Sequence, residues 1–197
     1  MFVDRIRKLG ILGGSFDPPH LGHLAIADFI ASNRDLDEVL FVVSHIQWQK
    51  AVDRAVLHSN DRFEMVKLAV KGYDNFSVSS IEIDRGGDSV TVETLESLHA
   101  EDSEAQYELI IGADIASTLS TWRRSEEIEE YADIIVVGRP GFQRVDSEED
   151  FNFVFVDGPR VDVSSEEIRS AVKLGLPIGH LVPEQVEEYI HREGLYR

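Results

Sequence analysis

Two histidines, His20 and His23, lie three residues apart just after a glycine turn, Gly13-Gly14. An apolar run precedes the turn and an apolar-periodic segment follows it, which predicts a strand, the turn and then a helix. A helix N-terminus binds phosphate well, because its unpaired N–H groups and the positive end of its dipole face the anion. Two imidazoles at such a place could neutralise charge that builds up on a reacting phosphate. The pattern therefore indicates nucleotide chemistry.

The same residues also have plainer interpretations. A histidine pair at this spacing could be structural or could bind zinc, although no third ligand is evident nearby. Gly13 and Gly14 let the backbone approach a phosphate closely, but most Gly-Gly pairs are simple turns. Their position after the first strand favours a function. We expect Ser15 and Phe16 to add backbone contacts, and residues 17–19 to shape the turn and the helix start.

The remaining chain alternates between strand-like and helix-like patterns. Predicted strands cover residues 8–13, 38–43, 75–83, 107–111, 133–137 and 151–157, and predicted helices cover 21–33, 60–71, 91–99, 164–175 and 183–194. We expect Ser59 to cap the second of these helices, and Pro183 to occupy the first position of the last. The alternation predicts an α/β fold, a Rossmann-like doubly wound parallel sheet with helices on both faces.

Ligands of such sheets bind outside the carboxyl ends of the strands. The first glycine turn, Gly112-Ala113-Asp114 and residues 138–141 all follow predicted strands, so we expect them to gather at one edge. Residues 1–197 are expected to form a single domain, with a small helical C-terminal part from about residue 164.

Composition excludes several classes of protein. The chain has 197 residues, of which 43% are hydrophobic, and its net charge of −18 argues against non-specific nucleic-acid binding. It has no cysteine, so disulfides and cysteine metal sites are excluded. No apolar stretch is long enough for a signal peptide or a membrane span, so we expect a cytoplasmic protein without a membrane partner.

The segment His20-Leu21-Gly22-His23 resembles the H-x-G-H motif of the nucleotidyltransferase superfamily. Within that superfamily, the chain looks like the bacterial nicotinate-nucleotide adenylyltransferases, and like the actinobacterial ones in particular. Further segments are similar to the signatures of this family and occur in the expected order. They are residues 46–50, residues 81–95, Gly112-Ala113-Asp114 with Trp122-Arg123, residues 164–169 and residues 181–196. The resemblance covers nearly the whole chain.

This resemblance implies adenylyl transfer from ATP to nicotinate mononucleotide, with Mg²⁺ accompanying ATP. Catalysis of this kind is mostly positioning and charge stabilisation. The implied catalytic residues are His20, His23, Lys50 and Arg169. The implied ATP-binding residues are Gly13, Gly14, Ser15, Phe16, His20, His23, Gly112, Asp114, Ser164, Ser165 and Arg169. Families of this kind often self-associate, so a homo-oligomer is also an expectation.

The resemblance further implies that Lys50, Trp48, Thr91 and Trp122 bind the mononucleotide. Trp122 would stack on the pyridine ring, and Thr91 would recognise the ring's carboxylate through a backbone N–H at a helix start. Plainer interpretations stand beside these roles. A tryptophan is more often a core residue, a loop lysine is usually an exposed charge, and Asp114 could cap a helix as well as bind a ribose hydroxyl.

The chain departs from the family pattern at three positions. Glu166 stands where threonine is usual, Val90 where tyrosine is common and Glu93 where aspartate is usual. A carboxylate facing a triphosphate would be unfavourable unless it turns away or meets the metal. Glu166 keeps open a nucleotide-binding regulator without catalysis. Two other enzymes are also alternatives: a nicotinamide-mononucleotide adenylyltransferase, and a phosphopantetheine adenylyltransferase, which shares the early motif.

Overall fold

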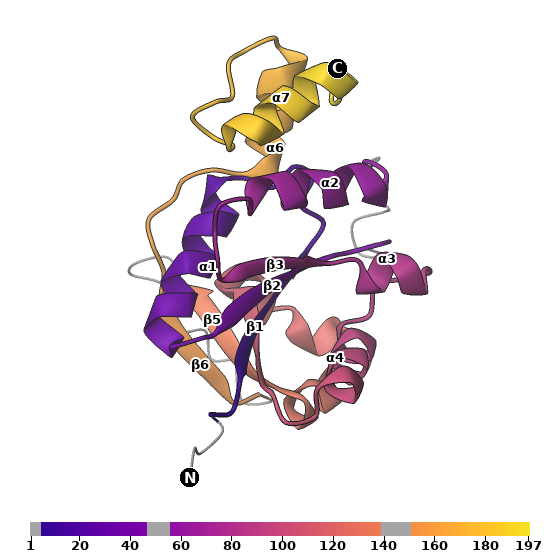
Figure 1. The fold of residues 1–197 in the computed structure, drawn as a ribbon, viewed down its shortest axis with the longest axis vertical. Coiled ribbons are helices and arrows are strands. Elements are labelled where there is room, and N and C mark those ends of the chain that lie inside the picture. Colours follow the sequence, from indigo (N-terminus) through magenta and orange to yellow (C-terminus); the bar gives the residue numbers. More distant parts are fainter. Residues whose placement is uncertain (1–4, 47–55, 139–150) are drawn as a thin grey trace.

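The computed structural model describes residues 5–46, 56–138 and 151–197, and within them parallel strands form a central sheet (Figure 1). The strands are β1 (Lys8–Gly14), β2 (Glu38–Val43), β3 (Phe76–Ser79), β4 (Gln106–Gly112), β5 (Ala132–Gly138) and β6 (Phe153–Asp157). Their order across the sheet is β3-β2-β1-β4-β5-β6, and every neighbouring pair is parallel. The predicted Rossmann-like, doubly wound fold is confirmed.

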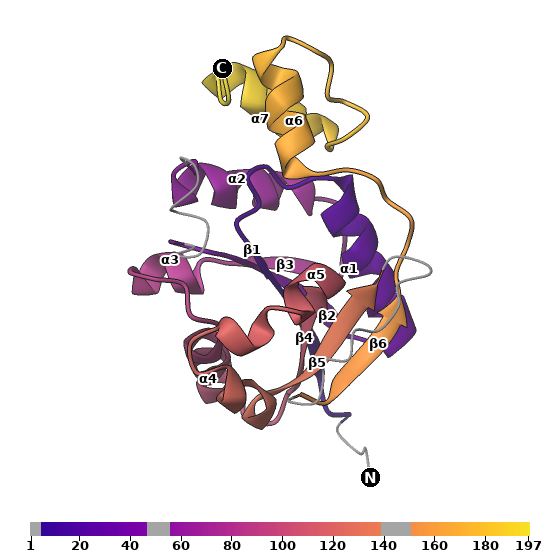
Figure 2. The ribbon, with the colours of Figure 1, turned by 180° about the vertical axis from the view of Figure 1, so that it is seen from behind.

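Helices cover both faces of this sheet (Figures 1 and 2). One face carries α1 (Leu21–Arg34) and α2 (Ser59–Ala69), and the other carries α4 (Thr91–Glu101) with the 3₁₀ turns η1 (Leu119–Thr121) and η2 (Ser125–Glu130). The short helices α3 (Ile81–Arg85) and α5 (Ala113–Ala116) follow β3 and β4. Because successive side chains of a strand point to opposite faces, the apolar runs of the strands supply two separate cores.

The helices α6 (Ser165–Lys173) and α7 (Glu184–Glu193) lie together beyond α2, at one end of the molecule (Figure 2). Their apolar sides are buried in the same core as α1 and α2, through Ile168 and Val172 of α6 and Val186 and Ile190 of α7. The N–H of Leu21 also donates to the carbonyl of Leu181 at 3.0 Å. These contacts fix the C-terminal helices against the start of α1.

The prediction of a strand over residues 75–83 is wrong in its second half. The strand ends at Ser79, and α3 follows almost at once. The Ser79 hydroxyl oxygen accepts the N–H of Ile81 at 3.2 Å, and the Ser80 hydroxyl donates to the Asp84 carboxylate at 2.6 Å. Such local bonds give the backbone an alternative to the sheet ladder, so the alternating Ile-Glu-Ile pattern forms a helical turn instead.

Two predicted helix starts are also displaced by one residue. His58, not Ser59, is the N-cap of α2, and its Nδ1 accepts the N–H of Asn60 at 3.3 Å. Pro183 is the N-cap of α7 rather than its first helical residue. None of the described helices combines the length and the apolar character that crossing a membrane requires.

The reversal of strand order lies between β1 and β4, where doubly wound sheets leave a crevice for ligands. Ile11 of β1 lies opposite Leu109 of β4, so Gly14 and Gly112, each three residues further on, end the two strands side by side. The sequence motifs that follow these glycines are therefore brought to one edge of the sheet.

Candidate active site

The two motif histidines lie at the start of α1, above the end of β1. His20 is the N-cap residue, with an extended backbone, and His23 occupies the first helical turn. Their rings stack with centroids 3.7 Å apart and an interplanar angle of 27°. The ring of Phe16 meets the His23 ring edge-on at 5.0 Å. The predicted pair is thus one compact unit held by a buried phenylalanine.

A backbone hydrogen bond fixes which nitrogen of His23 carries its proton. The N–H of His20 donates to Nδ1 of His23 at 3.1 Å. A neutral imidazole has one donor and one acceptor nitrogen, so a bond accepted at Nδ1 places the proton on Nε2. His23 therefore carries its donor N–H at Nε2.

The environment of His20 differs from the expectation. Burial lowers the pKa of His20 to about 4, so this ring is uncharged at neutral pH. In this environment His20 meets a phosphate as a neutral ring, so the expected neutralisation of phosphate charge by this residue stays a prediction. Its Nδ1 is buried without a hydrogen-bond partner among the described residues. Orphaned buried polar atoms are rare, and a neutral ring still offers a hydrogen bond to a ligand.

The glycine between the histidines makes room for the His20 ring. An ideal Cβ at Gly22 would lie 2.9 Å from Nδ1 of His20 and 3.0 Å from a methyl group of Val163. A side chain here would push the ring out of its position. The H-x-G-H spacing thus has a steric reason in this chain.

The second motif closes on the loop that follows β1. Ser164 is the N-cap of α6, and its hydroxyl oxygen accepts the N–H of Glu167 at 3.2 Å, as the plainer interpretation predicts. The Ser165 hydroxyl donates to the carbonyl of Pro18 at 2.8 Å, and Nη1 of Arg169 donates to the carbonyl of Asp17 at 2.8 Å. Residues about 150 positions apart in the chain therefore form one site.

The side chain of Glu166 is not buried against the loop that follows β1. Glu166 is exposed, while its neighbour Ser165 is partly buried against the loop.

The end of β4 supplies the next predicted residues. Gly112 is the N-cap of α5, and Asp114 lies in the first turn of that helix. An ideal Cβ at Gly112 would lie 2.5 Å from Oδ1 of Asp114. Glycine at position 112 thus lets the Asp114 carboxylate fold back over the helix start. Asp114 is exposed, at the same sheet edge as Gly14.

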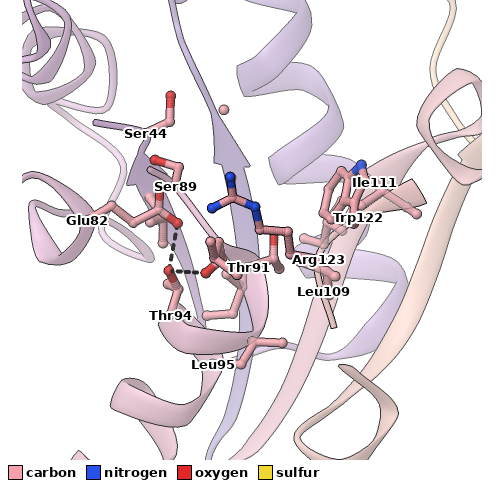
Figure 3. A pocket seen from close by; sticks show the side chains of 16 residues that line it. Ser44, Glu82, Ser89, Thr91, Thr94, Leu95, Leu109, Ile111, Trp122 and Arg123 are labelled. Carbon is pink, nitrogen blue, oxygen red and sulfur yellow. Dashed lines mark hydrogen bonds between the residues drawn. The ribbon is translucent and has the colours of Figure 1, made fainter. Parts of the chain in front are cut away.

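A cavity opens between the ends of β1 and β4 and the start of α4 (Figure 3). It brings together four predicted site residues, Gly13, Gly14, Thr91 and Trp122. Thr91 is the first residue of α4, whose N-cap residue, Val90, makes no side-chain capping bond. Among the described residues, no side chain caps the first-turn N–H groups of α4 at the cavity wall.

Trp122 and Arg123 form another wall of the cavity. The indole of Trp122 lies beside Ile111 in Figure 3, and its Nε1 is buried without a hydrogen-bond partner in the described part of the chain. Nη1 of Arg123 makes an ion pair with Oδ2 of Asp88 at 2.8 Å. The cavity therefore combines an aromatic face with a helix start and a guanidinium.

The structure adds residues that the sequence analysis did not single out. Glu82 is buried in the cavity wall, where the Thr94 hydroxyl donates to its Oε1 at 2.6 Å (Figure 3). Nη2 of Arg85 in turn donates to the Thr94 hydroxyl oxygen at 3.2 Å. Glu82 lies in the cavity wall because it belongs to the helical turn α3. The predicted strand over residues 75–83 did not indicate this position.

Some predictions cannot be placed. Lys50 and Trp48 lie outside the described residues, as do residues 139–141. In the parts that are described, no three His, Asp or Glu side chains gather in a way that could hold a metal ion. A metal site built from protein ligands is therefore not found in those parts.

The sheet is doubly wound, and an H-x-G-H helix start follows its first strand. A second helix start, which carries the serines and Arg169, closes on it. This combination defines a nucleotidyltransferase. The cytidylyltransferase-like family model matches residues 11–171. A probable nicotinate-nucleotide adenylyltransferase of Halalkalibacterium halodurans is 39% identical to this chain, over 98% of this chain and 92% of the relative. A probable nicotinate-nucleotide adenylyltransferase of Streptomyces coelicolor is 42% identical, over 94% of this chain and 99% of the relative. The chain belongs to the cytidylyltransferase-like family and, within it, to the nicotinate-nucleotide adenylyltransferases.

Solved structures show the same fold. A nicotinic acid mononucleotide adenylyltransferase of Plasmodium falciparum complexed with NaAD matches with a TM-score of 0.81, over 96% of this chain and 97% of that chain, at 18% identity. A putative nicotinate-nucleotide adenylyltransferase of Vibrio parahaemolyticus matches with a TM-score of 0.72 at 25% identity, over 98% and 96%. The sheet order and the C-terminal helices are therefore those of a known architecture.

Proposed function

We propose that this chain transfers the adenylyl group of ATP to nicotinate mononucleotide, giving nicotinate adenine dinucleotide and pyrophosphate. The observation that carries this proposal is the junction of the two motifs, where Arg169 and Ser165 hold the loop that leads to the stacked histidines. The relatives at about 40% identity carry the same activity in their names.

The reaction needs positioned donors rather than a protein nucleophile. A 5′-phosphate oxygen of the mononucleotide forms a bond to the α-phosphorus of ATP, and the bond from this phosphorus to the α,β-bridging oxygen breaks. Pyrophosphate leaves with the electron pair. The attacking group is already an anion, so the protein contributes alignment and stabilisation of charge on the phosphoryl oxygens.

The histidine pair and Arg169 have different roles in this reaction. The Nε2–H of His23 donates to an oxygen of the α-phosphate, and the neutral ring of His20 adds a second hydrogen bond. Arg169 holds the β- and γ-phosphates and so stabilises the leaving pyrophosphate. Mg²⁺ arrives with ATP as the Mg–ATP complex, since this ion is commonly held by substrate phosphates and water rather than by a protein cage.

The cavity accommodates the pyridine ring of the mononucleotide. The ring stacks on Trp122, and its carboxylate accepts N–H groups at the start of α4, beginning at Thr91. A helix start favours a negative charge over a neutral amide. This uncapped helix start therefore favours the acid form of the mononucleotide over the amide form.

The test is product formation by the full chain. Mg–ATP and nicotinate mononucleotide are incubated with the protein, and the dinucleotide is identified by mass while pyrophosphate is counted. We expect one dinucleotide for each pyrophosphate. Phosphate released without dinucleotide would indicate hydrolysis of ATP instead. Binding of ATP without any turnover would support the regulator, the alternative that Glu166 suggested.

Replacing Gly22 with alanine should impair catalysis without unfolding the protein. The new Cβ would displace the His20 ring, and small misplacements of catalytic groups cost about tenfold or more in rate. Alanine is the better helix former by about 1 kcal/mol, which offsets part of the steric strain. The measurement is kcat together with the thermal unfolding midpoint. Asp28→Ala, at an exposed position of the same helix, is the control. An unchanged kcat for Gly22→Ala would contradict the steric role.

Replacing Trp122 with alanine should mainly raise the KM for the mononucleotide. Aromatic stacking contributes about 1 kcal/mol beyond simple burial, so we expect a rise of about 5- to 10-fold. Trp122→Phe, which keeps an aromatic face, should recover most of the affinity. Steady-state kinetics at saturating Mg–ATP measures both variants. If KM for the mononucleotide stays unchanged in Trp122→Ala, the indole does not belong to the binding pocket.

A further inference from the structure

Arg62 of α2 is a charged side chain at the centre of the site's framework. Only 1% of its surface is exposed. Its guanidinium donates to the carbonyls of Leu57 (2.9 Å), Ser15 (2.7 Å), Ser44 (2.7 Å) and His45 (3.0 Å), and to the Ser44 hydroxyl at 3.5 Å. These acceptors come from the loop after β1, from the end of β2 and from the residue two before α2.

This set of acceptors matches what a guanidinium alone can serve. Arginine has five N–H donors in a planar fork, and within the described residues the guanidinium makes five hydrogen bonds to these acceptors. Lysine has three donors around a point charge and cannot span the same geometry. Arg62 therefore ties three segments together in a way that its nearest substitute cannot reproduce.

The bond to Ser15 also determines where the next amide points. In a planar trans peptide the carbonyl and the N–H point in opposite directions. The Ser15 carbonyl points at Arg62, so the N–H of Phe16 points away from Arg62. This N–H makes no hydrogen bond within residues 5–46, 56–138 and 151–197. It lies between Gly14 and the histidine pair.

The conformation of Phe16 shows that the loop is held firmly. Its φ is 47°, in the left-handed region that bulky residues rarely adopt. The ring is only 2% exposed and packs against Phe41 and His23, with centroids 5.7 and 5.0 Å away. Core packing on one side and the Arg62 bond on the other hold the Ser15–Phe16 peptide in this orientation.

We propose that Arg62 is a positioning residue for ATP. By holding the Ser15 carbonyl, it orients the Ser15–Phe16 peptide so that the Phe16 N–H donates to a phosphate oxygen of the nucleotide. Arg62 itself does not touch the substrate. This role rests on the proposed adenylyl transfer, because it assigns the phosphates of ATP to the loop after β1.

The kinetic test uses Arg62→Lys, which keeps the charge but loses the fork. We expect kcat/KM for ATP to fall about 10- to 100-fold, less than the roughly 10²- to 10³-fold cost of removing an aligned donor, because the Phe16 N–H is misaligned and not removed. Arg34→Lys is the matched control, because Arg34 pairs with Glu108 at 2.9 Å near the start of β4, away from the site. The control should keep its activity within about twofold. Unchanged kcat/KM in Arg62→Lys would overturn the proposal.

A spectroscopic test on the unmodified protein does not depend on how Arg62→Lys folds. With ¹⁵N-labelled phenylalanine, the Phe16 amide proton should move downfield on addition of Mg–ATP, as expected for a new bond to phosphate. In folded Arg62→Lys this movement should be smaller. If ATP shifts other resonances but leaves Phe16 in place, the inference is overturned. If Phe16 responds but no dinucleotide forms, the positioning role stands and the proposed reaction fails.

Discussion

Replacing His23 with alanine should lower kcat by about 10²- to 10³-fold and change ATP affinity only a few-fold. The expected loss is that of one hydrogen-bond donor aligned to the charge that develops on the α-phosphate. The structure gives this donor a defined position, because the His20 N–H holds Nδ1 and leaves the proton on Nε2. An interaction made mainly in the transition state affects kcat more than ground-state binding.

The measurement compares kcat from pyrophosphate release with the Kd of Mg–ATP from calorimetry. His180→Ala removes an exposed histidine outside the site and is the matched control. His23→Asn, whose amide N–H can donate, should recover part of the rate. A parallel loss of kcat and of ATP affinity in His23→Ala would assign the residue a structural role instead.

The second large effect is a loss of stability in acid caused by His20. Burial lowers the folded-state pKa of His20 to about 4, whereas an unfolded histidine titrates near 6.5. Between these values the unfolded chain binds a proton that the folded chain does not. Protonation of the unfolded chain at His20 therefore leaves the free energy of unfolding unchanged above about pH 6.5. As the pH falls towards 4, it lowers this free energy by about 3 kcal/mol in total.

Urea denaturation of wild type and His20→Gln at pH 7 and pH 4.5 isolates this contribution. Other groups titrate in both proteins, so the difference between their pH dependences belongs to His20. We expect the free energy of unfolding to fall more steeply in the wild type. Parallel pH dependences would show that the His20 ring is not held neutral by burial.

Much of the fold was accessible from sequence because its signals are local. Buried parallel strands are continuous apolar runs, and the residues 38–43, 107–111 and 133–137 have this character. The glycine turn and the capping serine of α6 also act within a few residues, so their positions could be predicted. The parallel direction of the strands then follows from the alternation of strands and helices, whereas their order is known only from the structure.

The errors occurred where side chains outweigh the pattern. Residues 81–83 alternate as a strand does, yet the hydroxyls of Ser79 and Ser80 start a helical turn there. Arg62 is an arginine on a helix, a pattern typical of a solvated charge. Its burial depends on the nearby Leu57 carbonyl and on carbonyls of Ser15 and Ser44, which lie 47 and 18 residues away, and no local pattern contains these two distant contacts.

The histidine pair illustrates the same limit. Its spacing predicted a phosphate site, but the charge state of His20 depends on how far the folded chain buries the ring, which the spacing does not contain. The exposure of Glu166 is likewise a property of how α6 sits on the loop after β1. The sequence motifs identified these residues as candidates, whereas their charge state and exposure depend on how the chain packs.

A comparison of three acceptors for the adenylyl group tests directly whether this protein is a nicotinate-mononucleotide adenylyltransferase. Pyrophosphate release from Mg–ATP is measured side by side with nicotinate mononucleotide, nicotinamide mononucleotide and phosphopantetheine. We expect the highest kcat/KM with nicotinate mononucleotide, because we propose that its carboxylate binds at the start of α4, where Val90 makes no side-chain capping bond. A preference for the amide form or for phosphopantetheine, or no turnover with any of the three, would contradict it.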